Sequence, residues 1–195
     1  MKKKVFAASV FLLCLAILAG TTMAYFTARD TAHNVITSGN VDIRLVEKQD
    51  RDGTLVDYPD GPITGVMPGE SVSKIVSVRN TGTGDAWVRI QVEKTMELDR
   101  EMAAAGTAAD PALMMLDINT EDWAEIGQWY YYREPLAPGK STEPLFREVS
   151  FSPKMNNPYQ GCTANVIVQA EAVQSKNNPK PASGDFSEIP GWPTK

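Results

Sequence analysis

The sequence predicts an all-β protein built as an antiparallel β-sandwich, and two observations carry this prediction. Apolar residues alternate with polar ones in several short runs, for example 41–45 and 86–92, and a period of two is typical of strands with one buried face. Turn sequences rich in Pro, Gly, Asn and Asp, such as Met67–Glu70 and Leu136–Lys140, separate these runs. Short alternating strands joined by such turns indicate two packed sheets.

The first 24 residues have the three parts of a secretory signal peptide. Three consecutive lysines precede an apolar run from Val5 to Gly20, and the small residues Thr22 and Ala24 follow. This order predicts cleavage after Ala24, so that the mature chain begins at Tyr25. The apolar run is shorter than the ~20 residues that cross a bilayer, which favours cleavage over an uncleaved anchor. We therefore predict a signal-peptide helix at residues 1–24, membrane association only before cleavage, and a secreted product.

Composition divides the mature chain into three segments. They are a polar leader, residues 25–37, a β-sandwich domain, residues 38–174, and a tail, residues 175–195. Within the domain, an alanine run and the pair Asp110-Pro111, a helix cap followed by a first-turn proline, predict a helical insertion at residues 96–118. The tail has four prolines and little apolar content, and we expect it to be disordered.

Two strand patterns in the middle of the domain are expected to form a hairpin-like pair. They are Ser71–Arg79 and Ala86–Lys94, and the Gly-rich turn 80–85 joins them. One face of the second strand is apolar, and the other carries Arg89, Gln91 and Glu93 beside a single tryptophan. The polar face predicts that one side of this sheet meets water.

Charge and cysteine content exclude several classes of protein. The net charge of −5 becomes −8 on cleavage, because the signal peptide takes away three lysines and no acid. This balance argues against a nucleic-acid or anionic-membrane surface, since both need basic clusters. Cys14 leaves with the signal peptide and Cys162 remains alone, so no intramolecular disulfide is possible. We interpret Cys162 as a buried small hydrophobe, with an intermolecular disulfide or a reactive thiol as the alternative.

Residues for catalysis or metal binding are sparse. The one histidine, His33, lies in the leader, whereas a zinc hydrolase needs two or three histidines and commonly an H-E-x-x-H motif. A serine or cysteine nucleophile would depend on the same histidine. The loop 50–60 offers four aspartates as calcium ligands, but it lacks the EF-hand spacing, which favours a solvated acidic loop. We predict a non-enzyme without cofactor or metal.

The run Trp129–Tyr132 predicts an aromatic strand. Alternation places Trp129 and Tyr131 on one face and the other two tyrosines on the opposite face. Exposed aromatic side chains of this kind can stack on sugar rings, which makes Trp129 and Tyr131 a possible carbohydrate- or surface-binding pair. Packing in a core or an interface explains the cluster equally well.

The run MAYFTARDTAHNVITSGNVDIRLVE, Met23–Glu47, resembles the start of the TasA/camelysin family. These are exported surface proteins of Gram-positive bacteria that a SipW-type signal peptidase cleaves. In that family an aromatic pair follows the cut, and then a strand of pattern N-x-x-x-x-G-x-[VL]-x-[IL]-x-L. Here the pattern is filled by Asn34, Gly39, Val41, Ile43 and Leu45, and Ala28 stands where Asp is usual. A weaker similarity covers Val66–Glu93. The resemblance implies a jelly roll, with an immunoglobulin-like sandwich as the alternative.

The resemblance also implies a function, a structural subunit of a cell-surface fibre or biofilm matrix. In fibre-forming relatives the processed N-terminal segment enters the sandwich of the next subunit as a donor strand, which satisfies the unpaired backbone groups of an open sheet edge. Carried onto this chain, the inserting or anchoring residues would be Tyr25, Phe26, Val35 and Ile36. The implied partners are the signal peptidase and copies of this chain or related matrix subunits.

Two other functions stay open. Camelysin relatives carry a metallo-endopeptidase label, so an exported metallo-endopeptidase is the first alternative. A monomeric carbohydrate- or surface-binding module is the second, and it would use the aromatic strand.

Overall fold

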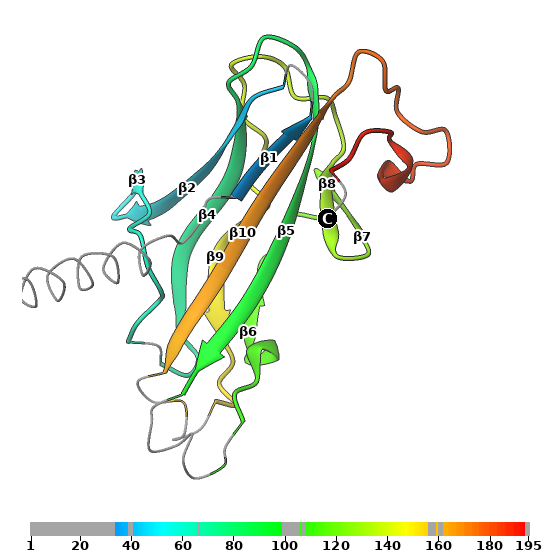
Figure 1. The fold of residues 1–195 in the computed structure, drawn as a ribbon. Helices are drawn as coiled ribbons and strands as arrows, with labels where there is room; N and C mark the ends of the chain where they lie inside the picture. Colours follow the sequence, from blue (N-terminus) through cyan, green and yellow to red (C-terminus); the bar gives the residue numbers. More distant parts are fainter. Residues whose placement is uncertain are drawn as a thin grey trace, which may run out of the picture. The chain divides into compact units, whose positions relative to one another are not determined.

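The alternating residues form two β-sheets that face each other across a common core (Figure 1). Sheet A has the strand order β1 (Asn34–Ser38), β10 (Thr163–Gln174), β5 (Ala86–Glu97), β8 (Trp129–Tyr132) and β7 (Trp123–Ile126). Sheet B has the order β3 (Thr54–Asp57), β2 (Ile43–Arg51), β4 (Ser71–Asn80), β9 (Phe146–Phe151) and β6 (Met114–Leu116). Neighbouring strands are antiparallel except β1 and β10. The prediction of an all-β sandwich of antiparallel sheets is confirmed.

This computed structural model describes residues 34–38, 41–65, 67–98, 106, 108–155, 159 and 162–193. All of them belong to one compact unit, His33–Lys195. The predicted signal peptide with its helix and the leader as far as His33 lie outside the described residues. Among the helical turns that are described, none is long and apolar enough to cross a membrane.

The core takes the inward half of each alternating strand. Val78 of β4 and Val88 and Ile90 of β5 are at most 1% exposed. On β10, Ala170 lies opposite Ile90 and Ala172 lies opposite Val88, and both alanines are completely buried. Small and large side chains therefore alternate between neighbouring strands, which lets the two layers interdigitate at the packing density of a protein interior.

The predicted hairpin of the two middle strands is wrong, because β4 lies in sheet B and β5 in sheet A. The connection between them is held at one end of the sandwich. The N–H groups of Thr81 and Gly82 both donate to the Asp42 carbonyl at 2.9 Å, and the Asn80 amide donates to the Leu136 carbonyl at 2.8 Å. A β-carbon at Gly82 would lie 2.9 Å from the Asp42 nitrogen, so only glycine fits there. Two strands can bury their apolar faces equally well side by side in one sheet or in two sheets that face each other. The alternation of apolar residues therefore cannot distinguish a hairpin from strands in opposite sheets.

The helical insertion predicted at 96–118 is only partly described, because residues 99–105 and 107, which include the alanine run, lie outside the described residues. Of the rest, Met96 and Glu97 continue β5, and the helix predicted to begin at Asp110-Pro111 is a single 3-10 turn, Pro111–Leu113. Asp110 does cap this turn, since its side chain accepts the Ala112 N–H at 3.0 Å. The next residues form β6, which pairs with β9, because strand pairing in the sheet overrides local helix preference.

The predicted disorder of the tail is also wrong for residues 175–193, which we call the C-terminal strap. The strap folds onto the outer face of sheet A and contains a 3-10 turn, Phe186–Glu188 (Figure 1). Phe186 and Ile189 are 3% and 2% exposed, and Trp192 packs against the same cluster. A spacing of three residues places these apolar side chains together, and Pro190, which lies between Ile189 and Trp192, reduces the conformational entropy that ordering costs.

Candidate functional site

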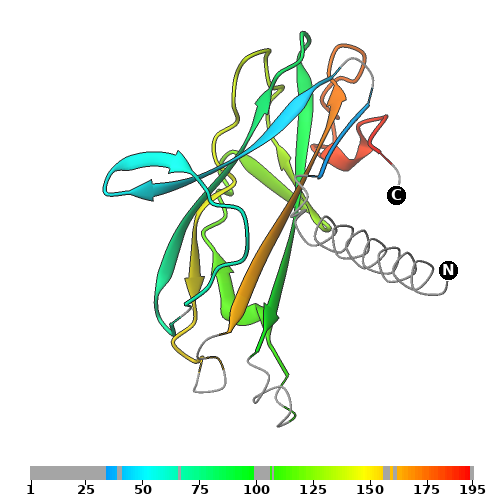
Figure 2. The same ribbon diagram turned by 60° about the vertical axis from the view of Figure 1, so that its left-hand side comes forward.

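The candidate site is the edge of sheet A at which β1 joins β10. Asn34 pairs with Gln169 and Ser38 with Val173, in parallel register, and both ribbon views show β1 running alongside β10 (Figure 2). Val35 lies opposite Ala170 in this register. Parallel neighbours cannot be joined by a short hairpin, so a parallel strand at the edge of an antiparallel sheet must arrive from elsewhere in the chain.

Backbone polarity explains how β10 receives β1. Ala164 exchanges two hydrogen bonds with Ile63, at 2.8 and 3.0 Å, on the side of β10 opposite β5. Alternate residues of a strand direct their N–H and C=O to the same side, so Ala170 and Ala172 direct theirs toward β1. The next residues of β10 keep the ladder with β5 without a break. β10 is therefore fully paired with β5 on one side. On its other side, alternate backbone groups are left to pair with β1.

Part of this edge has no described strand beside it. Between the Ile63 bridge at Ala164 and the start of β1 at Gln169, the stretch Asn165–Val168 pairs with no strand on the β1 side within the described ranges. At about 3.3 Å per residue, this leaves about 13 Å of edge. Ile167, in this stretch, is 40% exposed, one of the most exposed large apolar side chains among the described residues.

The structure describes only part of the predicted assembly residues. Val35 and Ile36 lie in β1, as backbone that pairs with β10. Tyr25 and Phe26, together with the cleavage-site residues Thr22 and Ala24, lie outside the described residues.

The proposed aromatic binding surface is covered. Trp129 and Tyr131 share the outer face of sheet A, as alternation predicts, but Tyr131 is only 2% exposed. Its ring stacks on Phe186 with 6.2 Å between centroids and meets Trp192 edge-on at 5.6 Å. The sequence left an exposed binding face and packing in a core or an interface equally open, because it gave no sign that the C-terminal strap folds back over these residues. A sugar ring has no access to Tyr131 in this structure.

A buried ion pair lies beneath the strap, on the face that the polar pattern of β5 predicted to meet water. The Arg89 Nη2 and Nε atoms donate to the same Glu171 oxygen at 2.6 and 2.8 Å, and Glu171 is 1% exposed. Arg89 Nη2 also donates to the Pro193 carbonyl at 3.2 Å. The guanidinium carbon lies 4.0 Å from the Trp129 ring centroid and 4.5 Å from that of Trp192. The prediction of a wet face is wrong at this end of the sheet, because the strap excludes water from it.

The strap is fastened at both of its ends. Near its start the Trp87 indole Nε1 donates to the Asn178 carbonyl at 2.6 Å, and near its end the Pro193 carbonyl accepts from Arg89 Nη2 at 3.2 Å. Within the strap, the Trp192 indole donates to the Phe186 carbonyl at 3.0 Å. The sequence signal for this arrangement is the three-residue spacing of Phe186, Ile189 and Trp192 among prolines.

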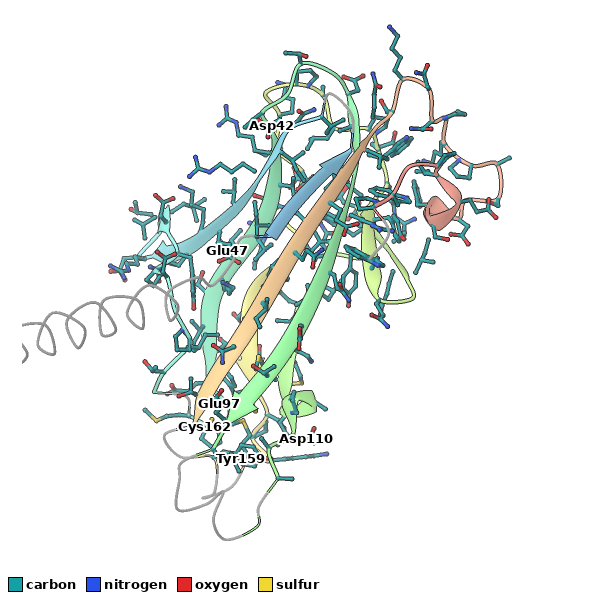
Figure 3. The ribbon with its side chains drawn as sticks, in the orientation of Figure 1. Asp42, Glu47, Glu97, Asp110, Tyr159 and Cys162 are labelled. Carbon is teal, nitrogen blue, oxygen red and sulfur yellow. The ribbon has the colours of Figure 1, made fainter. Side chains whose placement is uncertain are left out.

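Cys162 is buried, as predicted, with 1% exposure. It lies near Tyr159 and Asp110 at the end of the sandwich opposite the Asp42 turn (Figure 3). Its N–H donates to the Tyr159 carbonyl at 3.1 Å, and burial raises the pKa of its thiol. A neutral, enclosed thiol behaves as a packing residue.

The aspartates of the loop 50–60 have local roles. The Asp50 carboxylate accepts the Gly53 N–H at 2.7 Å and closes the β2–β3 turn. The hydrogen bond from Lys48, at 2.6 Å, and its charge lower the pKa of Asp57. Across the residues described, no three His, Cys, Asp or Glu side chains gather closely enough to hold a metal ion. His33 lies outside the described residues.

The fold and this site define a class, a two-sheet β-sandwich whose N-terminal edge strand is added in parallel. Comparison with known proteins adds no narrower assignment, because no family model, no curated protein and no solved structure matches the chain.

Proposed function

We propose that the chain is a secreted structural subunit of a cell-surface fibre or biofilm matrix, which assembles by donating its processed N-terminal strand to a neighbouring subunit. The observation that carries the proposal is β1, the first of the described strands in sequence order, which occupies the edge of sheet A and pairs in parallel with β10. A strand held in this way can leave its own sheet and pair with the same edge of another copy. The exchange conserves the hydrogen bonds of the edge, so it costs little.

The open stretch of β10 supports the same proposal. A donated strand that keeps the β1 register and continues toward its N-terminus would run beside Asn165–Val168, because parallel strands advance together. The contact is heterologous, since a donor end meets an acceptor edge, and it therefore propagates into a filament.

The remaining assignments follow from the sequence. The signal peptide supports export, and the resemblance of Met23–Glu47 to the TasA/camelysin family supports cleavage by a SipW-type peptidase and a place at the Gram-positive cell surface. Cleavage frees the N-terminal segment from the membrane and so permits donation. A jelly-roll arrangement of the two sheets belongs to the same proposal.

Sedimentation and electron microscopy of two proteins test the proposal. One begins at Tyr25, and the other lacks Tyr25–Thr37. We expect filaments from the first and monomers from the second, because the second has no strand to donate.

A matched pair of proline variants separates strand donation from other effects of truncation. Val35→Pro combined with Ile36→Pro removes two consecutive N–H groups from β1, so one of the losses faces the acceptor edge whichever residue points there. Ala28→Pro, which precedes β1, is the control and should still form filaments. Filaments from the double variant, or monomers from all versions at varied pH and protein concentration, would contradict the proposal.

A further inference from the structure

Two arginines stand directly opposite each other on the outer face of sheet B. Arg44 of β2 is the register partner of Arg79 of β4, and both side chains are exposed. Side chains at directly opposite positions have β-carbons about 4.5–5.5 Å apart, and like charges in this arrangement are destabilising. In the part of the chain that the structure describes, neither guanidinium forms an ion pair or a hydrogen bond.

This pair differs from the two cations that are buried among the described residues. The two buried cations, Lys74 and Arg89, each contact a carboxylate, Lys74 through Glu47 at 2.8 Å. Acids outnumber basic residues along the chain by 24 to 19, so counter-charges are not scarce. Among the described residues neither Arg44 nor Arg79 has a carboxylate within ion-pair distance, although the charge of Arg44 helps to lower the pKa of Asp57.

A groove runs beside the arginines. It has a volume of about 650 Å³, and it is lined by Ile43, Arg44, Leu45, Val46, Glu47, Lys48, Asp57, Tyr58, Asp60 and Arg79. β3 begins to pair with β2 only at Lys48, so within the described residues no strand pairs on the groove side with the half of β2 that carries Arg44.

We propose that Arg44 and Arg79 form a binding site for the phosphate group of an anionic ligand. Each guanidinium offers a planar fork of N–H donors that matches two oxygens of an oxyanion. The oxygens of a tetrahedral phosphate can accept hydrogen bonds from both guanidinium groups at once, whereas a single guanidinium group occupies both oxygens of a carboxylate. The bound anion converts the repulsion between the arginines into two attractive contacts.

The ends of the groove limit the ligand. Asp57 and Asp60 line the other end of the groove, and Asp57 forms an ion pair with Lys48 at 2.6 Å. Lys48 lies four residues along β2 from Arg44, which is about 13 Å at the rise of a strand. These carboxylates repel a second anionic group placed there. The site therefore holds one phosphate group rather than a polyanion laid along the whole groove.

The first test measures binding of inorganic phosphate, of long-chain polyphosphate and of polygalacturonate by calorimetry, with the chain that begins at Tyr25. We expect phosphate to bind and polygalacturonate to bind at least tenfold more weakly. Tighter binding of polyphosphate than of free phosphate identifies a polymer as the source of the group, and equal binding per chain identifies the free ion. The proposal is overturned if phosphate does not bind, or if the carboxylate polymer binds as tightly.

Variants locate the site. R44Q and R79Q should each weaken phosphate binding about tenfold, since each removes one charge-assisted fork. R51Q removes an exposed arginine at the end of the same strand and should leave binding within twofold. Equal losses in all three variants would show a general charge effect and would sink the proposal.

Stability provides a readout that does not depend on locating the ligand. Without phosphate, R79Q should raise the denaturation midpoint, because it relieves the repulsion of Arg44. With saturating phosphate the same substitution should lower the midpoint relative to the unchanged chain. A midpoint that R79Q shifts in the same direction under both conditions would refute the proposal.

Discussion

Replacing Glu171 by Gln should destabilise the protein strongly, because it leaves the Arg89 charge buried without its counter-charge. The carboxylate is 1% exposed and accepts two bonds from Arg89, through Nη2 at 2.6 Å and Nε at 2.8 Å. Removing one partner of a buried pair typically costs about 3–5 kcal/mol. Arg89 keeps the Pro193 carbonyl and two indole rings, so we expect a loss near the lower bound, about 3 kcal/mol of unfolding free energy.

Urea denaturation followed by tryptophan fluorescence measures this loss. For a chain of this size, about 3 kcal/mol corresponds to a decrease in Tm of about 6–12 °C. Asp57→Asn is the control, since it breaks the exposed Lys48–Asp57 pair, and surface pairs contribute little. The double variant R89M/E171M should recover most of the loss, because an apolar pair leaves no buried charge. An E171Q protein as stable as the D57N control would refute the assignment of Glu171 as the essential partner of Arg89.

Two further predictions concern buried side chains at opposite ends of the sandwich. Phe186→Ala should lower the free energy of unfolding by about 3–5 kcal/mol if the strap stays in place, and by less if the strap detaches. In either case water should reach Tyr131 and Trp87, whose rings contact Phe186. A red shift of tryptophan emission checks this, and an unchanged spectrum would contradict a strap that seals the face. Burial raises the pKa of the Cys162 thiol, so its contribution to stability is complete below the unfolded pKa and is lost as pH rises through the folded value. Iodoacetamide at pH 8.5 should therefore label Cys162 slowly in the native protein and quickly in urea, and equal rates would show an exposed thiol.

Alternation along the chain was sufficient to locate most strands, because side chains of a strand point to opposite faces whatever sheet it joins. The runs that contain Ile43, Val78 and Ile90 are strands with these residues inside. The same signal also placed Trp129 and Tyr131 on one face correctly. Local chemistry identified the Asp110 cap and the burial of Cys162, since both depend on near neighbours.

The sequence by itself determined the all-β class and the inward residues, and it predicts an export signal that lies outside the described residues. Tertiary structure alone decided which sheet each strand joins, that β1 adds in parallel to β10, and that the C-terminal strap covers Arg89 and Glu171. The physical reason is the range of the interactions. Periodicity reports which side of a strand is apolar, but whether its polar side meets water depends on segments about a hundred residues away, such as Pro193, which lies 104 positions from Arg89.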